Sequence, residues 1–158
     1  MNHTEIAWDC GSGNGQAAVN LAEIFNKVFA TDASAKQIEH AIIHKNVSYS
    51  VQPSENTNFH DSSFDCVTVA QAIHWFDLKK FYNEVNRVLK PGGLLCVWGY
   101  TWFKISDDID EIVEKTLITS LKDYWAPQTK LLQDGFKDLV LPYKQIVVPS
   151  FEIVVHWD

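Results

Sequence analysis

Short apolar runs alternate with stretches of helical periodicity along the first hundred residues. The run at 64–70 (FDCVTVA) is almost continuously apolar, which is typical of a strand covered on both faces. Shorter strand-like runs lie at 6–8, 28–31, 47–51 and 94–98. Helical spacing of apolar side chains occupies 16–26 and 78–89. Because parallel strands need long crossovers, this order predicts an α/β fold: a doubly wound, mostly parallel sheet with helices on both faces.

Capping and turn residues indicate where two of the expected helices begin and end. Ser34 and Gln37 form a capping-box pattern that opens a helix with Ile38, Ala41 and Ile42 facing inward. The sequence KPGG at 90–93 is expected to stop the preceding helix in a turn.

The last third of the chain continues the same domain. Residues 107–124 carry apolar side chains at helical spacing, and 146–157 resembles strand material interrupted by Pro149. Neither a repeat nor a low-complexity linker divides the sequence. We therefore expect one domain over residues 1–158.

Charge and hydropathy exclude several classes of partner. The net charge is −7, and Arg87 is the single arginine, which leaves little to neutralise a nucleic-acid backbone. No apolar run approaches the roughly 18 residues of a membrane span, and the polar start lacks the layout of a signal peptide. We expect a cytoplasmic protein that binds neither nucleic acid nor membrane.

Cysteine and histidine spacing does not indicate a metal site. Cys10, Cys66 and Cys96 are widely separated in sequence and flanked by apolar residues, which favours buried small side chains over a disulfide framework or a zinc site. His40 and His44 have the spacing of a helical pair but no third ligand nearby. We expect no bound metal.

Three glycines, Gly11, Gly13 and Gly15, follow the first apolar run at alternate positions. They allow a sharp bend and a close backbone approach to a ligand at the carboxyl end of a strand, where open α/β sheets bind ligands. The dinucleotide pattern G-x-G-x-x-G does not fit, because the position that requires glycine or alanine is Gln16. Asp9 would crowd a pyrophosphate but suits a cation. The turn thus favours a ligand with a positive end and no phosphates over a plain tight turn.

A second acidic residue, Asp32, ends the second apolar run nineteen residues beyond Gly13. A carboxylate at about this distance commonly binds the two hydroxyl groups of a ribose. The alternative role, capping the next helix, already falls to Ser34. We therefore predict that Asp32 binds a ribose.

Four ordered segments, WDCGSGNG, VFATDAS, FDCVTVAQAIHWFD and RVLKPGGLLCVWGY, resemble the successive motifs of class I S-adenosylmethionine-dependent methyltransferases. The segment AQAIHWFD, together with the later WGY, is similar to sequences of the small-molecule group that includes trans-aconitate methyltransferases. The likeness is strong over 6–100 and weaker beyond. It implies a Rossmann-like methyltransferase fold, S-adenosylmethionine as cofactor, and a small organic acceptor, a carboxylate or a hydroxyl.

The resemblance also implies a set of cofactor contacts. The residues expected to contact the methionine part of S-adenosylmethionine, or to line its methionine end, are Asp9, Cys10, Gly11, Ser12, Gly13 and Gln71. Asp32 would hold the ribose and Ala33 would lie beside the adenine. Pro53 stands where relatives often have an acid, so Ser54 and Glu55 are expected to contact the adenine instead.

Methyl transfer from a sulfonium depends chiefly on orientation of the acceptor, so a catalytic side chain is optional. His74 is the best-placed candidate to take a proton from an alcohol, phenol or amine, and the alternative is that it packs beneath the cofactor. Trp75 is expected in the core, although an aromatic face near a sulfonium would be favourable. A carboxylate acceptor meets an objection, because it needs cationic partners and Arg87 is expected to lie away from the pocket.

Relatives usually carry further residues before the first strand and after the last one present here, so we expect a fold truncated at both ends. Either the sequence is a partial domain, or the pocket is unusually open. Exposed apolar surface would then favour a homo-oligomer. Two other functions stay open at this point: a cofactor-binding or interaction module with little catalysis, and a nicotinamide-dependent oxidoreductase on the same fold.

Overall fold

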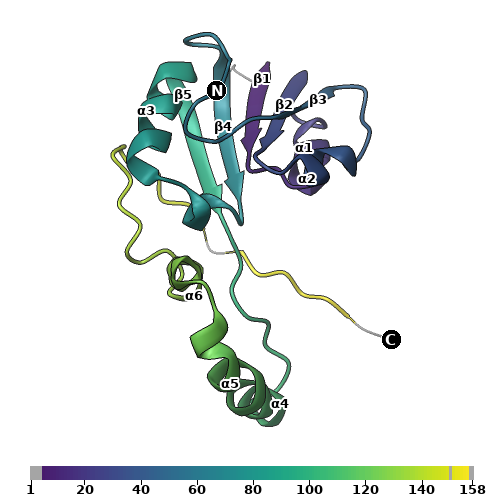
Figure 1. Cartoon of the computed structure of the whole chain (residues 1–158), viewed down its shortest axis with the longest axis vertical. Coiled ribbons are helices and arrows are strands. Elements are labelled where there is room, and N and C mark those ends of the chain that lie inside the picture. Colours follow the sequence, from purple (N-terminus) through teal and green to yellow (C-terminus); the bar gives the residue numbers. More distant parts are fainter. Residues whose placement is uncertain (1–4, 150, 157–158) are drawn as a thin grey trace.

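A five-stranded parallel sheet forms the centre of the protein, in the order β3-β2-β1-β4-β5 (Figure 1). The computed structural model describes residues 5–149 and 151–156. The strands are β1 (Ile6–Cys10), β2 (Lys27–Asp32), β3 (Val47–Val51), β4 (Phe64–Ala70) and β5 (Leu89–Trp98). This sheet, with helices on both faces, confirms the predicted doubly wound α/β fold.

Helices pack on the two faces through separate apolar clusters. The helices next to the sheet are α1 (Gln16–Leu21), α2 (Ala35–Glu39), the 3₁₀ turn η1 (Ile73–Trp75) and α3 (Leu78–Val88). Ala18 of α1 packs with Ala7 and Val28 on one face, whereas Phe81 of α3 packs with Trp8 and Val67 on the other. Alternate residues of β1 therefore point to opposite layers, as a strand covered on both sides requires.

The crossover from β3 to β4 contains no helix; residues 52–63 form a loop that covers the α3 face instead. Phe59 from this loop packs edge-on against Phe64, with ring centroids 4.8 Å apart, and also contacts Trp8 and Phe29. Edge-to-face pairs of this kind add to the stabilisation from burial. The loop thus replaces the covering helix with aromatic side chains.

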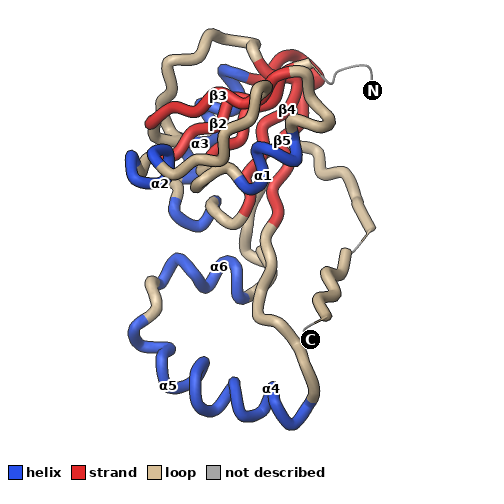
Figure 2. The backbone as a smooth tube through the Cα atoms, turned by 90° about the vertical axis from the view of Figure 1, so that its right-hand side faces the viewer, coloured by secondary structure: helices blue, strands red, loops and turns tan. Residues whose placement is uncertain are grey.

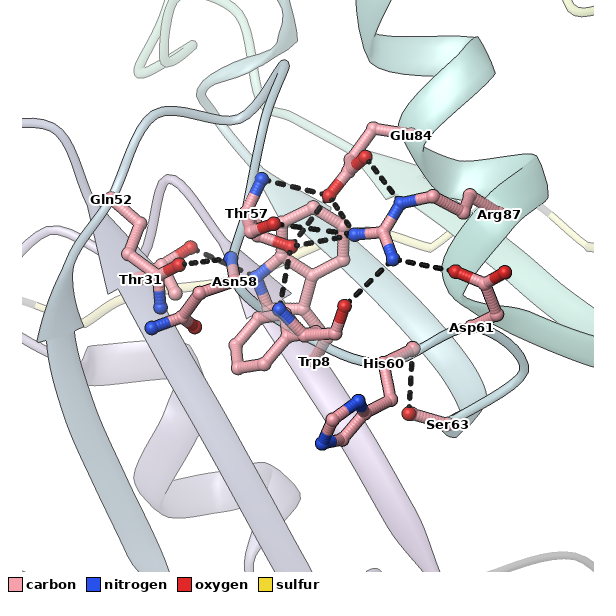
Figure 3. Close-up of polar contacts among 11 residues, drawn as sticks. Trp8, Thr31, Gln52, Thr57, Asn58, His60, Asp61, Ser63, Glu84 and Arg87 are labelled. Atoms are coloured by element: carbon pink, nitrogen blue, oxygen red, sulfur yellow. Dashed lines mark hydrogen bonds and ion pairs between the residues drawn. The ribbon is translucent and has the colours of Figure 1, made fainter.

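A partly buried ion pair anchors the same loop to α3 (Figure 3). Glu84 accepts hydrogen bonds from the Thr57 backbone N–H at 2.8 Å and from Arg87 Nη2 at 2.6 Å. Arg87 also donates to the Phe59 carbonyl at 2.7 Å and to Asp61 at 2.8 Å. Burial alone would raise the pKa of Glu84, but the hydrogen bonds from Arg87 and Thr57 outweigh burial and lower it. Because every charge in this network is paired, the loop is held without an orphaned buried charge.

Two expectations about element ends need correction. The KPGG sequence does not stand between a helix and a strand: Phe64 pairs with Leu89 and Cys66 with Leu94, so KPGG bulges within β5. The helix that begins at Ala35 ends at Glu39, and Ile42 beyond it is 42% exposed. The Ser34 cap itself is confirmed, since its side chain accepts from the Gln37 N–H.

The segment expected as strand material at 146–157 has no regular structure over its described parts, 146–149 and 151–156, and Figure 2 draws it as loop. Trp157 lies outside the described residues. Val147 and Phe151 of this segment are exposed. Apolar β-branched composition indicates a strand only where a neighbouring strand is available, and none lies beside this segment among the described residues.

The predicted helical region at 107–124 is confirmed as a continuous series of turns. Its parts are α4 (Asp107–Val113), a π-helical turn η2 (Glu114–Ile118), α5 (Thr119–Leu121) and a 3₁₀ turn η3 (Lys122–Tyr124). A further 3₁₀ turn η4 (Pro127–Thr129) and α6 (Lys130–Gln133) follow. Figures 1 and 2 show α4 and α5 apart from the sheet, whereas Phe136 and Tyr143 return to pack against the α3 layer. Within the described chain, every helix is too short or too polar to cross a membrane.

Candidate functional site

A cavity of about 290 Å³ opens at the carboxyl edge of the sheet. It is lined by Gly11, Asp32, Ala33, Ser34, Gln52, Ser54, Glu55, Ala72, Trp75 and Phe76. These residues lie at or beyond the carboxyl ends of β1, β2, β3 and β4, which meet at one edge because the strands are parallel. Its volume is at the small end of the range for ligand sites.

Gly11 brings the first turn against the segment that follows β4. Its φ is 68°, and a Cβ at this position would lie 2.6 Å from the Ala72 Cβ, so any larger residue would push the two segments apart. The N–H groups of Gly11 and Ser12 both donate to the Thr31 carbonyl at 2.9 Å. The turn is therefore fixed to β2 through backbone, which leaves this wall of the cavity without side chains.

Asp32 joins the turns after β1 and β2. Its Oδ2 accepts the Gly13 N–H at 2.9 Å and its Oδ1 accepts the Ser34 N–H at 2.8 Å. A carboxylate offers about four lone-pair sites, so each oxygen keeps capacity for a further donor. Asp32 can thus organise the two turns and still accept hydrogen bonds from a ligand in the cavity that it lines.

Asp9 lies beneath the turn and is fully buried. Its Oδ1 accepts the Thr68 hydroxyl at 2.9 Å, while its Oδ2 has no hydrogen-bond partner among the described residues. Burial raises the pKa of Asp9 to about 6; the Thr68 hydrogen bond opposes this shift and the charge of Asp32 adds to it. The site therefore holds a carboxylate that would be stabilised by a nearby cation.

The opposite wall comes from residues after β3 and β4. Glu55 Oε1 accepts the Asp77 N–H at 2.9 Å, which ties this wall to the start of α3. Trp75 and Phe76 supply flat apolar surface. The expectation that Trp75 belongs to the core was wrong, because Trp75 is 59% exposed and lines the cavity. The short η1 turn after β4 rotates it outward.

Five of the residues predicted to bind a cofactor line the cavity: Gly11, Asp32, Ala33, Ser54 and Glu55. Five others do not, namely Asp9, Cys10, Ser12, Gly13 and Gln71. The first four belong to β1 or to the glycine turn beside the cavity. The cavity is also lined by five residues that the sequence analysis did not predict: Ser34, Gln52, Ala72, Trp75 and Phe76. Each lies beyond the carboxyl end of a strand, which is the signal that could have identified them.

Gln71 turns its side chain toward β5. Its Nε2 donates to the Tyr100 carbonyl at 3.0 Å, and its Oε1 is buried without a hydrogen-bond partner in the described part of the chain. Its φ of 55° is unusual for a residue with a side chain and marks a strained end of β4. Its place at the methionine end of a cofactor stays a prediction.

His74 lies next to the cavity but is not part of its wall. The residue is 8% exposed, its ring centroid is 4.8 Å from that of Trp75, and its Nδ1 has no partner among residues 5–149 and 151–156. Burial lowers the pKa of His74, so the imidazole is neutral at pH 7 and can accept a proton. This geometry is compatible with either predicted role, packing or proton transfer.

Metal ligands do not gather at this site. Across the described residues, no group of three or more histidine, cysteine, aspartate or glutamate side chains could hold an ion. The cavity instead combines backbone donors, two carboxylates and aromatic surface, which suits an organic ligand.

The sequence profile of the methyltransferase domain family matches residues 8–97. That span contains β2, β3 and β4, all of β1 except Ile6 and Ala7, and all of β5 except Trp98. It also contains all the lining residues of the cavity. The chain belongs to this family. The narrower resemblance to trans-aconitate methyltransferases stays a prediction.

Similar proteins carry names consistent with this methyltransferase domain. A Dictyostelium discoideum protein whose name describes a methyltransferase is 40% identical over 151 residues, which cover 94% of this chain and 54% of the relative. A Saccharomyces cerevisiae protein whose name describes an S-adenosylmethionine-dependent methyltransferase is 25% identical, over 85% of this chain and 48% of the relative. The chain thus spans about half the length of these curated relatives.

A solved structure from Anaeromyxobacter dehalogenans, described as a type II methyltransferase, has the same fold. It superposes with a TM-score of 0.83 at 35% sequence identity, covering 92% of this chain and 62% of the other. The sheet of this methyltransferase domain and the segments after it therefore follow the arrangement of that structure.

The raised pKa of Asp9 predicts a pH-dependent stability. A folded-state pKa of about 6 against 3.8 means that Asp9 stabilises the fold below pH 4 and that this contribution is lost as the pH rises through 6. The loss is on the order of 3 kcal/mol. We expect Asp9→Asn, which keeps an acceptor for Thr68, to abolish this part of the pH dependence and to be more stable than the wild type at pH 7.

Urea unfolding from pH 4 to 8 measures this difference. Asp138→Asn, which changes an exposed carboxylate, is the matched control and should follow the wild type. If the free energy of unfolding changed with pH in the same way in Asp9→Asn and in the wild type, the raised pKa of Asp9 would be contradicted.

Proposed function

We propose that this methyltransferase domain binds S-adenosylmethionine in the cavity at the carboxyl edge of the sheet and transfers its methyl group to a small organic acceptor. The observation that carries the proposal is the pair of carboxylates: Asp32 in the cavity wall and Asp9 buried beneath the adjoining turn. The cofactor has a ribose with two hydroxyl donors and a permanently positive sulfonium. Each carboxylate matches one of these features.

Asp32 is the proposed ribose ligand. Its two oxygens are already oriented by the N–H groups of Gly13 and Ser34, so binding the diol costs little reorganisation. The neighbouring Ala33 lines the same cavity and offers apolar contact to the adenine. Ser54 and Glu55 face them as the proposed polar contacts to the base.

Asp9 is the proposed electrostatic partner of the positive end. A cation near its unpaired Oδ2 would recover part of the free energy lost by burying the carboxylate. The backbone of Cys10, Gly11, Ser12 and Gly13 lies between Asp9 and the cavity, and we propose that it contacts the methionine part. Asp9 therefore acts through charge rather than as a wall of the cavity.

S-adenosylmethionine supplies a methyl group that is already activated for displacement. The protein then has to hold the acceptor in line and exclude water, and orientation alone can lower a barrier by about 7–11 kcal/mol. No covalent intermediate on a side chain is needed.

A hydroxyl acceptor is better supported than a carboxylate. The wall contains two carboxylates, Asp32 and Glu55, and no lysine or arginine. Arg87 is engaged with Glu84 and Asp61 in the network under the 52–63 loop. A carboxylate acceptor would meet repulsion without a compensating cation.

His74 is the proposed proton acceptor for such a hydroxyl. Its neutral imidazole carries an Nδ1 without a partner in the described chain, next to the aromatic wall of the cavity. A positioned base typically contributes a factor of 10² to 10⁴ to the rate.

Calorimetric titration with S-adenosylmethionine, S-adenosylhomocysteine and NAD tests the cofactor. We expect the first two to bind and NAD not to bind. Asp32→Ala should weaken both cofactor forms at least tenfold, and to the same extent, because both carry the ribose. Asp9→Asn should weaken S-adenosylmethionine more than its uncharged product, because only the former carries the sulfonium.

Two outcomes would overturn the proposal: unchanged dissociation constants for Asp32→Ala, or binding of NAD in preference to both methionine compounds. Binding without any methyl-sized mass gain across a panel of hydroxyl acceptors would favour the interaction module instead.

The His74→Gln variant tests the proton acceptor on an alcohol or phenol substrate. We expect kcat/KM to fall at least a hundredfold and the acid limb of its pH profile to disappear. If His74 only packs against Trp75, the melting temperature falls while the shape of the pH profile is unchanged.

A further inference from the structure

Two of the three cysteines lie side by side on neighbouring strands, away from the cavity. The Sγ atoms of Cys66 on β4 and Cys96 on β5 are 3.8 Å apart, and both thiols are free. Cys66 pairs in register with Leu94, so Cys96 lies two residues further along β5 and on the same face of the sheet. The third cysteine, Cys10, is fully buried in the cluster on the other face.

The two thiols differ in exposure and in acidity. Cys96 is exposed, whereas Cys66 is buried. The Cys66 thiol donates to the Cys96 sulfur, and this hydrogen bond lowers the pKa of Cys96 to about 7 against the opposing effect of burial. The same interaction, together with burial, raises the pKa of Cys66. At pH 7 about half of the Cys96 thiol is therefore ionised, whereas Cys66 retains its proton.

We propose that Cys96 and Cys66 are a peroxide-reactive dithiol, in which Cys96 is the attacking thiol and Cys66 the resolving thiol. The Cys96 thiolate attacks the terminal oxygen of a hydroperoxide and the O–O bond breaks, giving a sulfenic acid on Cys96. The alkoxide or hydroxide that leaves takes a proton from solvent and becomes an alcohol or water. The Cys66 sulfur then attacks the Cys96 sulfur, the S–O bond breaks, and the Cys66 proton leaves with the hydroxide as water. Two thiols are oxidised to one disulfide while one peroxide is reduced.

The arrangement of the two side chains supports both steps. Access to Cys96 is open, which the first step needs, and the resolving sulfur is already in contact, which the second step needs. The sulfur atoms must approach from 3.8 Å to about 2.0 Å, a movement that side-chain rotation and a small shift of the β5 edge strand supply. Cys10 has no such neighbour and burial raises its pKa, so it should stay reduced.

Oxidation of the full chain with one equivalent of hydrogen peroxide at pH 7, followed by alkylation under denaturing conditions, tests the proposal. The three cysteines of the reduced chain take three alkyl groups. We expect the oxidised chain to take one and to lose about 2 Da in intact mass. Peptide mapping should find the Cys66 peptide linked to the Cys96 peptide, and a thiol reductant should restore all three reactive groups.

Matched variants separate the two roles. In Cys66→Ser the sulfenic acid has no resolving partner, so Cys96 should be labelled by dimedone. In Cys96→Ser neither remaining thiol should react. Cys10→Ala, which removes the uninvolved cysteine, should form the crosslink like the wild type.

Three alkylated cysteines after peroxide treatment of the wild type would overturn the proposal. So would stepwise oxidation of Cys96 to sulfinic acid without a linked peptide, or a crosslink confined to disulfide-bonded dimers. Because peptide mapping uses the unmodified chain, the outcome does not depend on whether the variants fold. It is also independent of cofactor binding.

Discussion

The hydrogen bonds of the Asp32 carboxylate connect the two turns from which the cavity is built. One oxygen accepts from Gly13, in the turn after β1, and the other accepts from Ser34, at the start of α2. Without this carboxylate, the Gly13 and Ser34 N–H groups would lose their acceptor and would depend on solvent for a replacement. The same group is the proposed ribose ligand. Its structural role therefore explains why the site is organised before a cofactor binds.

The neighbouring carboxylate, Asp9, is fully buried, and burial raises its pKa. Asp9 has one satisfied oxygen and one buried oxygen without a partner in the described chain, and its raised pKa records the resulting cost. A protein tolerates such a cost where a ligand compensates for it. Asp32 and Asp9 are thus separated by one turn but serve different parts of the proposed cofactor, one by hydrogen bonds and one by charge.

The sequence predicts the sheet and the edge of the sheet at which the cavity lies, because both depend on local patterns. Apolar runs mark the strands, and in a parallel sheet their carboxyl ends necessarily meet. The orientation of individual side chains depends on tertiary packing, which local patterns do not encode. For this reason Asp9 is found beneath the cavity, Trp75 in its wall rather than in the core, and 146–156 outside any strand.

Contacts between distant segments are the main features that sequence reasoning missed. The loop at 52–63 has no helical periodicity, and its attachment through Thr57, Glu84 and Arg87 joins residues about thirty positions apart. Cys66 and Cys96 are likewise thirty residues apart, and only the register of β4 against β5 brings them together. In both cases the residue types are visible in the sequence but their proximity is not.

A crystal structure of the chain with S-adenosylhomocysteine tests the central claim most directly. We expect the ribose hydroxyls to lie within hydrogen-bond distance of both Asp32 oxygens, and the base to contact Ala33 in the cavity. The amino acid part of the ligand should extend over the turn above Asp9. A ligand bound elsewhere, or a ribose without contact to Asp32, would contradict it.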